Sequence, residues 1–472
     1  MSERPTQVKN LKTLDALRAH LDGLGVEIPL AETVEPDGVL ASPVSFEDAS
    51  AGTITIRNRF AVLPMEGWDG TADGFPTDLV RRRWTRFAAS GCGLVWGEAT
   101  AVRADGRANP NQLVLDERTV EDIADLRALL RPGQVAALQL THSGRWSRPE
   151  GAPRPRTAYR HPELDDRSAA DGTSLLTDDE LDELVERYVV AAVLAQQAGF
   201  ELVDVKHCHG YLLHELLSAH DRPGPYGGDL VGRTHFLRSV VAGIRDRAPG
   251  LGVAVRLSAF DVRPFAPGEG GTGVPATEGR YPHAFGGDGT GLGIDLTEVH
   301  AFLDLLTELG IGLVSTTAGS PYYNPHVQRP AFFPPSDGYQ PPEDPLVGVA
   351  RQLAVTAELA AAHPAIAIVG SGYSYLQDWL PHVAQAVVAG GGAAMVGLGR
   401  MVLSYPELAA DVLAGRPLER TLVCRTFSDC TTAPRNGLVS GCFPIDPFYK
   451  EHPQRVDLTQ AKRAAKARLR EG

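Results

Sequence analysis

Three side chains that can bind substrates or transfer protons stand close together after the apolar run at residues 202–205. Lys206, His209 and Tyr211 supply an ammonium, an imidazole and a phenol. A short apolar run that follows a long helical pattern predicts a buried parallel strand, and barrels and open α/β sheets carry their chemistry at the carboxyl ends of such strands. The three residues therefore predict either a catalytic site or a polar loop that closes a barrel.

The residues around this cluster closely resemble the fourth-strand signature of the Old Yellow Enzyme family of flavin-dependent oxidoreductases. The matching segments are HGYLL at residues 209–213 and YGG at residues 226–228, whereas Lys206 stands where the family usually has a histidine. In that family the tyrosine matching Tyr211 donates a proton to the substrate. The residues matching Lys206 and His209 hold the substrate carbonyl oxygen and stabilise its negative charge. The resemblance therefore implies that these three residues are catalytic.

The family binds flavin mononucleotide (FMN), and other segments of this chain resemble its FMN-binding strands. Gln139 matches a glutamine that binds the flavin pyrimidine, an edge that suits the donor and acceptor of an amide. Arg256 matches an arginine near flavin N1 and O2. Glycine-rich turns at residues 370–372 and 397–400 would let backbone N–H groups approach a phosphate that an arginine neutralises. The cofactor-binding residues predicted in this way are Pro64, Met65, Glu66, Ala99, Gln139, Arg256, Gly370, Ser371, Gly372, Gly399 and Arg400.

Two of these residues could instead serve the barrel's own structure, and two positions depart from the family pattern. Gln139 could be a buried amide satisfied by the barrel backbone, and Arg256 could form a salt bridge across the barrel. Glu66 stands where the family has a small residue beside flavin O4 and N5. A carboxylate there could repel the reduced flavin or lower its potential, unless it is protonated or turned away. Lys206 could shift the substrate preference toward phenolate, carboxylate or nitro groups.

The last part of the chain contains a degenerate cysteine loop. Cys424, Cys430 and Cys442 lie in a segment that resembles the iron–sulfur loop of the 2,4-dienoyl-CoA reductase and trimethylamine dehydrogenase branch. A cuboidal cluster needs four thiolates, but Val423 and Thr426 stand where two of them should be. We therefore expect no cluster and no metal site, and none of the branch's further nucleotide-binding domains. Electrons would then enter at the flavin directly from NADH or NADPH.

Eight short apolar runs alternate with helical patterns along the chain. They lie at residues 60–63, 93–96, 135–140, 202–205, 253–257, 312–315, 366–369 and 394–396. The clearest helical pattern covers residues 177–197, where Thr177 and Glu180 form a capping box. This alternation predicts a (β/α)8 TIM barrel. A doubly wound sheet would alternate in the same way, but the count of eight and the lack of an early Gly-x-Gly-x-x-Gly turn favour the barrel.

The chain is expected to have three parts. They are an N-terminal helical extension at residues 1–45, an FMN-binding barrel at 46–420 and a C-terminal extension at 421–472. Amphipathic positions that predict an accessory helix on the barrel's outside are Val8, Leu11, Leu14, Leu17 and Leu21. The segments 262–294 and 320–345 are rich in Gly and Pro and too long for simple connections, so we expect them to shape a substrate pocket.

Composition limits the class of partner. The 472 residues include 45 Lys and Arg against 58 Asp and Glu, and the formal charge of −13 disfavours nucleic acid and anionic membranes. Five cysteines are too few for a disulfide scaffold, and the N-terminus has no apolar leader. We therefore expect a soluble cytoplasmic protein with a small-molecule substrate, and a homodimer is plausible.

Taken together, these features predict an FMN-dependent ene-reductase. Hydride from NADH or NADPH would pass through flavin N5 to the β-carbon of an activated alkene, while Tyr211 gives a proton to the α-carbon. One alternative is a flavin-dependent dehydrogenase or oxidase that acts in reverse on a small cyclic or amine substrate. Another is a flavin-free barrel enzyme that forms a Schiff base at Lys206. A third is a degenerate barrel that binds flavin or a partner without turnover.

Overall fold

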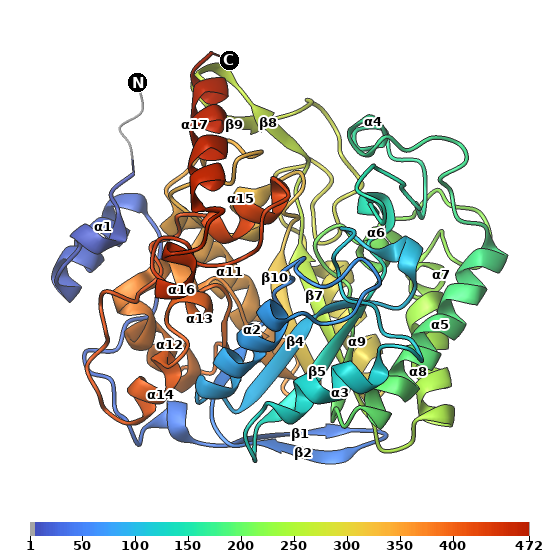
Figure 1. The fold of residues 1–472 in the computed structure, drawn as a ribbon, viewed down its shortest axis with the longest axis horizontal. Helices are drawn as coiled ribbons and strands as arrows, with labels where there is room; N and C mark the ends of the chain where they lie inside the picture. The colour runs from blue at the N-terminus through green and yellow to red at the C-terminus, as the bar shows by residue number, and fades with distance from the viewer. Residues whose placement is uncertain (1–4, 472) are drawn as a thin grey trace.

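Eight parallel strands close into one barrel at the centre of the molecule (Figure 1). This computed structural model describes residues 5–471. Neighbouring strands follow the order β10-β11-β12-β3-β4-β5-β6-β7, and β7 pairs with β10 to close the barrel. Each predicted apolar run forms one strand, so the predicted (β/α)8 barrel is confirmed. The strands are β3 (Phe60–Val62), β4 (Leu94–Ala101), β5 (Val135–Thr141), β6 (Leu202–Val205), β7 (Gly252–Phe260), β10 (Leu313–Ala318), β11 (Ala367–Gly370) and β12 (Met395–Leu398).

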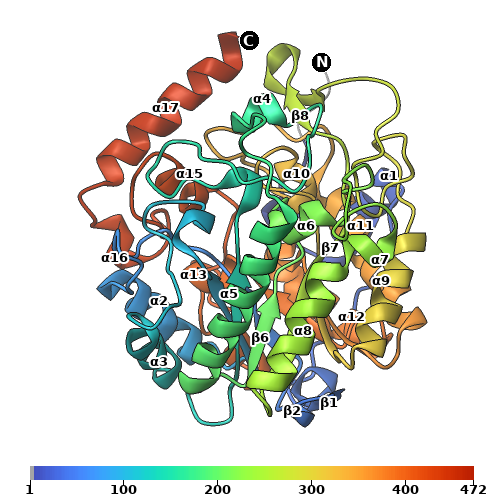
Figure 2. The same ribbon diagram turned by 90° about the vertical axis from the view of Figure 1, so that its right-hand side faces the viewer.

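The larger helices surround the barrel because each buries one apolar face against the strands (Figure 2). The larger ones are α2 (Asp78–Ala89), α3 (Val120–Ala128), α5 (Asp178–Gln197), α8 (His235–Arg247), α9 (Thr297–Glu308), α11 (Pro345–Ala362), α12 (Leu380–Ala389) and α14 (Leu408–Leu413). Shorter ones are α4 (Asp165–Ser168), α6 (Leu212–Leu216), α7 (Leu230–Arg233) and α13 (Met401–Ser404). The capping box predicted from Thr177 and Glu180 is present at the start of α5.

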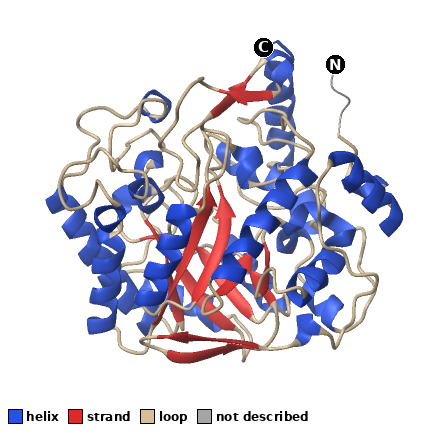
Figure 3. Ribbon diagram, turned by 180° about the vertical axis from the view of Figure 1, so that it is seen from behind, coloured by secondary structure: helices blue, strands red, loops and turns tan. Residues whose placement is uncertain are grey.

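A hairpin that the sequence patterns did not predict closes the amino end of the barrel. Strands β1 (Val44–Asp48) and β2 (Gly52–Ile56) pair antiparallel and lie across that end (Figure 3). Phe46 and Ile56 are buried in one apolar cluster with Trp96 of the barrel interior. A barrel filled and covered in this way is not a pore, so its chemistry must lie at the opposite end.

The predicted amphipathic segment near the N-terminus forms a helix on the outside of the barrel. Helix α1 (Leu14–Leu24) buries Leu17 and Leu21, and the Thr13 side chain accepts a hydrogen bond from the first turn. Trp379 Nε1 donates to the carbonyl of Leu11 at 2.8 Å and ties this segment to the barrel domain. The division into three parts with boundaries at residues 45 and 420 stays a prediction.

Long connections and the C-terminal segment cover the carboxyl end of the barrel (Figure 1). Their elements are the hairpin strands β8 (Phe265–Pro267) and β9 (Gly273–Pro275), and the helices α10 (Pro325–Gln328), α15 (Asp429–Arg435), α16 (Pro447–Lys450) and α17 (Arg455–Glu471). The expected loops at residues 262–294 and 320–345 thus lie on the face where the strands end. In the part of the chain that the structure describes, no helix is both long and apolar enough to cross a membrane.

The capping box at the start of α5 gives a test of the fold. The Thr177 hydroxyl accepts from the Glu180 N–H at 3.2 Å, and the Glu180 carboxylate accepts from the Thr177 N–H at 2.8 Å. We expect Thr177→Ala to lower the free energy of unfolding by about 1 kcal/mol, measured by urea denaturation. The matched control is Thr85→Ala, at an exposed position inside α2, which should change it by less than about 0.5 kcal/mol. An equal loss in both variants would contradict the capping role.

Candidate active site

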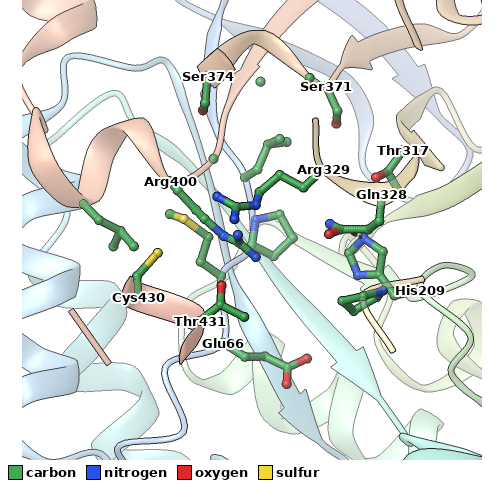
Figure 4. Close-up of a pocket in the computed structure, with 18 of the residues that line it drawn as sticks. Glu66, His209, Thr317, Gln328, Arg329, Ser371, Ser374, Arg400, Cys430 and Thr431 are labelled. Carbon is green, nitrogen blue, oxygen red and sulfur yellow. Dashed lines mark hydrogen bonds between the residues drawn. The ribbon is translucent and has the colours of Figure 1, made fainter. Parts of the chain in front are cut away.

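A cavity at the carboxyl end of the barrel collects most of the predicted site residues. Those that line it are Pro64, Met65, Glu66, Gln139, Lys206, His209, Tyr211, Arg256, Ser371, Gly372, Gly399 and Arg400. Lining residues that the sequence analysis did not single out for this site include Trp68, Tyr322, Gln328, Arg329, Thr426 and Arg435, as well as two of the loop cysteines, Cys424 and Cys430. Gln328, Arg329 and Cys430 are labelled in Figure 4. Two predicted residues, Ala99 and Gly370, are not among the residues that line the cavity.

One side of the cavity holds two arginines without a counter-charge. Arg329 and Arg400 extend next to each other from different loops (Figure 4), and within residues 5–471 neither forms an ion pair with a carboxylate. Burial lowers the pKa of both guanidinium groups, and the neighbouring Arg400 charge helps to bring the pKa of Arg329 to about 9. Ser371 and Gly372 line the same cavity. Two partly buried guanidinium groups side by side favour a bound anion, and a phosphate fits this place.

Gln139 is held in a fixed orientation below the cavity. Its amide Nε2 donates to Asp204 Oδ2 at 2.5 Å, and the indole of Trp96 donates to the same oxygen at 2.9 Å. The backbone N–H of Arg256 donates to Asp204 Oδ1 at 2.8 Å. These contacts leave the Gln139 amide oxygen as an acceptor for a bound molecule. The partner of Gln139 is thus a side-chain carboxylate rather than the barrel backbone.

Arg256 places its guanidinium beside the same cavity. Its Nη1 donates to the Pro64 carbonyl at 3.3 Å, while its buried Nε has no hydrogen-bond partner in the described part of the chain. Burial lowers the pKa of this group. The alternative of a salt bridge across the barrel finds no support, since no carboxylate of the described residues pairs with it. An unsatisfied buried donor at this position fits the electron-rich N1 and O2 edge of FMN.

The two departures from the family pattern are partners of each other. Lys206 Nζ lies 3.0 Å from Glu66 Oε1, with the lysine side chain 3% exposed and the glutamate 14%. Glu66 Oε2 accepts from Trp68 Nε1 at 2.8 Å and from the Tyr211 hydroxyl at 3.1 Å. Lys206 Nζ also sits 3.7 Å from the ring centroid of Tyr211. The predicted role of Lys206 in holding a substrate oxygen stays a prediction, but its ammonium is directed to Glu66.

Tyr211 is held in its neutral form at the centre of this network. Burial, the Glu66 charge and the neighbouring Tyr322 all raise the pKa of its phenol well above the ordinary value. The hydroxyl of Tyr322 lies 3.0 Å from the Tyr211 hydroxyl, and the Tyr322 ring stacks on Trp146 with centroids 4.5 Å apart. These rings form an aromatic wall beside the proton-bearing oxygen of Tyr211.

His209 enters the cavity from a strained backbone. Its φ of 67° lies in the left-handed region, and Ser320 donates to its carbonyl oxygen at 2.8 Å while its N–H donates to Ser258. Burial is the main cause that lowers the pKa of the imidazole well below its usual value, and the charges of Arg256 and Lys206 lower it further. The imidazole is therefore neutral and can either donate or accept a hydrogen bond.

The cysteine loop contributes to the cavity wall. Cys424 and Cys430 line it, and all five cysteines are free thiols. Thr426 in the same loop adopts a φ of 53°, another left-handed conformation at the rim of the cavity. Among the described residues, no group of three or more His, Cys, Asp or Glu side chains could hold a metal ion.

Known proteins are similar to this chain in sequence. Residues 46–274 match the model of the NADH:flavin oxidoreductase / NADH oxidase family. An NADPH dehydrogenase of Clostridium acetobutylicum is 29% identical over 49% of this chain and 67% of that protein. An NADPH dehydrogenase of Bacillus subtilis is 25% identical over 78% of this chain and 93% of that protein.

Solved structures share the fold at low sequence identity. A 2-naphthoyl-CoA reductase in complex with 2-naphthoyl-CoA gives a TM-score of 0.67 at 18% identity, and the match covers 88% of this chain and 58% of that chain. The old yellow enzyme homologue from Zymomonas mobilis gives a TM-score of 0.55 at 22% identity, with 80% of this chain and 93% of that chain covered. This chain therefore spans little more than half the length of the first of these structures.

The unpaired arginines predict how FMN is retained. We expect Arg400→Gln to weaken FMN binding about 10- to 100-fold, because it removes a charged hydrogen-bond donor from a buried phosphate site. The measurement is the dissociation constant from fluorescence titration of flavin-free protein. The matched control is Arg420→Gln, at an exposed arginine that pairs with Asp378 outside the cavity, which should bind FMN as the parent does. Equal affinities of Arg400→Gln and the parent would contradict the phosphate site.

The burial of Asp204 predicts how stability depends on pH. Burial raises the pKa of this carboxyl to about 6, so between about pH 4 and pH 6 the folded chain binds a proton here that the unfolded chain has lost. This stabilisation of up to about 3 kcal/mol is complete below pH 4 and is lost as pH rises through 6. Urea unfolding should therefore show a larger loss between about pH 4.5 and 7 in the parent than in Asp204→Asn, which cannot titrate. Parallel pH dependences would contradict the assignment.

Proposed function

We propose that this chain, which belongs to the NADH:flavin oxidoreductase / NADH oxidase family, transfers hydride from NAD(P)H through FMN to an activated alkene. This family is the Old Yellow Enzyme family that the sequence motifs predicted. The family confirms the predicted class, an FMN-dependent NAD(P)H oxidoreductase, and the predicted cofactors. The observation that supports the alkene-reducing reaction is the Tyr211 phenol, which is a neutral proton donor. It lines the same cavity as the arginines and Gln139, the residues that suit a flavin.

The cavity residues divide into those that suit FMN and those that suit a substrate. Arg329 and Arg400 would hold the phosphate, and Gln139 and Arg256 would meet the pyrimidine edge. Bound there, FMN would supply hydride transfer from NAD(P)H to the β-carbon of the alkene. A positive guanidinium at the pyrimidine edge favours negative charge on that side of the ring, and its burial strengthens the effect.

The substrate side would place a carbonyl-activated alkene between His209 and Tyr211. The neutral imidazole of His209 would donate a hydrogen bond to the carbonyl oxygen and stabilise the charge that develops on it. The Tyr211 hydroxyl would then give its proton to the α-carbon. Trp68 and Tyr322 supply apolar ring surface beside this place and help to exclude water.

A second candidate is the same chemistry in reverse, the desaturation of a small cyclic substrate. One observation favours it: the Tyr211 hydroxyl already donates to the Glu66 carboxylate at 3.1 Å, which is the arrangement of a phenol that passes its proton on. The phenol could then take a proton from an acidic C–H group while hydride leaves to the flavin, which NAD(P)+ or dioxygen would reoxidise.

The remaining alternatives gain less support. A Schiff base at Lys206 needs an amine that is free to attack a carbonyl carbon, but Lys206 Nζ is paired with Glu66 at 3.0 Å and lies over the ring of Tyr211. A binding module without turnover would not need a buried, neutral phenol next to a carboxylate.

Anaerobic half-reactions test the proposed function. NADPH or NADH should bleach the absorbance of the bound flavin, and 2-cyclohexen-1-one should restore it. We expect Tyr211→Phe to slow the second step about 100-fold or more, because the α-carbon loses its proton donor, and to change the first step little. Stopped-flow absorbance at the flavin band measures both.

The matched control is Tyr188→Phe, at a buried tyrosine of α5 that does not line the cavity, which should resemble the parent in both steps. A flavin that neither nicotinamide reduces would overturn the proposed function. An unchanged second step in Tyr211→Phe would overturn the role of the phenol.

A further inference from the structure

Tyr322 lies between the proton donor Tyr211 and a second cavity. Its hydroxyl oxygen is 3.0 Å from Tyr211 Oη. Tyr322 lines both the cavity of the candidate active site and an outer cavity of about 780 Å³, whereas of these two cavities Tyr211 lines only the first. Asp78, Arg148 and Asp337 line the outer cavity and are exposed, so this cavity opens to solvent. The Tyr322 phenol therefore connects the buried Tyr211 with a place that water can reach.

The fold holds Tyr322 in this place through both its ring and its backbone. The ring stacks on Trp146 with centroids 4.5 Å apart and planes within 4° of parallel. The Tyr322 N–H donates to Ser320 Oγ at 3.2 Å, and the same Ser320 hydroxyl donates to the His209 carbonyl at 2.8 Å. These contacts fix the Tyr322 hydroxyl beside Tyr211 Oη.

The contact with Glu66 determines which of the two phenols is the donor. Tyr211 has a single hydroxyl proton, and it donates that proton to Glu66 Oε2 at 3.1 Å. Glu66 also accepts hydrogen bonds from Lys206 and Trp68, so it acts here as an acceptor only. The oxygen of Tyr211 must therefore accept the proton of Tyr322.

We propose that Tyr322 relays protons between the outer cavity and Tyr211, so that Tyr211 regains a proton from Tyr322 in the step in which it protonates the substrate. The inference rests on the proposed function, because it names a further residue of the same site. Tyr322 acts through Tyr211 and is a positioning residue in that sense, since the proton that reaches the substrate is the one on Tyr211 Oη.

The relay balances at every atom. The α-carbon takes the Tyr211 proton with the electron pair that it gains as the β-carbon accepts hydride, and Tyr211 takes the Tyr322 proton in the same step. Negative charge then rests on Tyr322, which regains a proton from solvent water in the outer cavity. The hydroxide that is left takes up the one proton that the overall reaction consumes. In the reverse reaction the same steps carry a proton from the substrate to solvent.

The charges around the two phenols favour this direction. Burial, the Glu66 charge and Tyr322 all raise the pKa of Tyr211. Burial and the Glu66 charge also raise the pKa of Tyr322, but the charges of Arg435 and Arg148 lower it. The Arg435 guanidinium lies 6.0 Å from the Tyr322 ring centroid. Negative charge therefore costs less on Tyr322 than on Tyr211, and the relay moves it away from the Glu66 carboxylate.

The solvent isotope effect on the second half-reaction tests the relay. NADPH-reduced parent holoenzyme is mixed with 2-cyclohexen-1-one in mixtures of H2O and D2O, and stopped-flow absorbance gives the rate of flavin reoxidation. Because two O–H bonds break in one step, the rate should fall along a curve as the deuterium fraction rises. Tyr322→Phe keeps the ring that stacks on Trp146 but has no proton to relay. It should react about tenfold or more slowly and give a straight line, as expected when a single proton moves.

The neighbouring tyrosine provides the matched control. Tyr323 is buried in the same cluster of rings and lines neither cavity, and its hydroxyl donates to Asp261. Whatever its rate, Tyr323→Phe should keep the curved dependence of the parent, because the relay is intact. Reduction of the flavin by NADPH involves no proton from Tyr211, so it serves as the internal reference and should be unchanged in Tyr322→Phe.

The outcomes distinguish the relay from the proposed function. A curve in the parent that becomes a straight line in Tyr322→Phe, but not in Tyr323→Phe, supports the relay. A curve that survives in Tyr322→Phe, a straight line in both variants, or a parent with a straight line or no isotope effect overturns it and leaves the flavin chemistry intact. If NADPH reduces the flavin but the enone does not reoxidise it, the relay also falls. If NADPH fails to reduce the flavin, the proposed function itself is wrong.

Discussion

A largely buried ion pair between Lys206 and Glu66 determines how the substrate side of the cavity is built. The two residues follow strands β6 and β3, which are separated in the barrel by β4 and β5. A buried charge that loses its partner destabilises a protein by several kcal/mol, so each residue constrains the other. The pair in turn fixes Tyr211, whose ring receives the ammonium at 3.7 Å and whose hydroxyl donates to the carboxylate. The ion pair therefore acts together with burial and Tyr322 to set the position and protonation of the phenol.

The opposite side of the cavity carries positive charge that no carboxylate of the described residues neutralises. Arg256 is buried, Arg329 and Arg400 are partly buried, and the loss of solvent lowers the pKa of each. A bound dianionic phosphate and an electron-rich ring edge would neutralise these groups. A ligand that binds only the folded state raises the free energy of unfolding, so bound FMN would stabilise the fold as well as supply its chemistry.

The barrel could be predicted from the sequence because its strands are buried on both faces and appear as continuous apolar runs. Gln139 and Arg256 could be recognised for the same reason, because each is a polar residue inside an apolar run. The hairpin of β1 and β2 was missed because β1 alternates buried and exposed residues over only five positions. Arg329 and Tyr322 lie in a loop whose approach to the cavity depends on tertiary packing. Glu66 and Lys206 were each identified as departures, but 140 residues separate them and no local pattern indicates their contact.

The hairpin at the amino end has a consequence for how molecules reach the site. With β1 and β2 packed across that end, the cavity lies at the opposite end, where the long connections and the C-terminal segment meet. A nicotinamide donor and an electron acceptor would then both reach the flavin from this end of the barrel. Such a site favours ping-pong kinetics, in which the first product departs before the second reactant docks and an excess of either reactant inhibits the other.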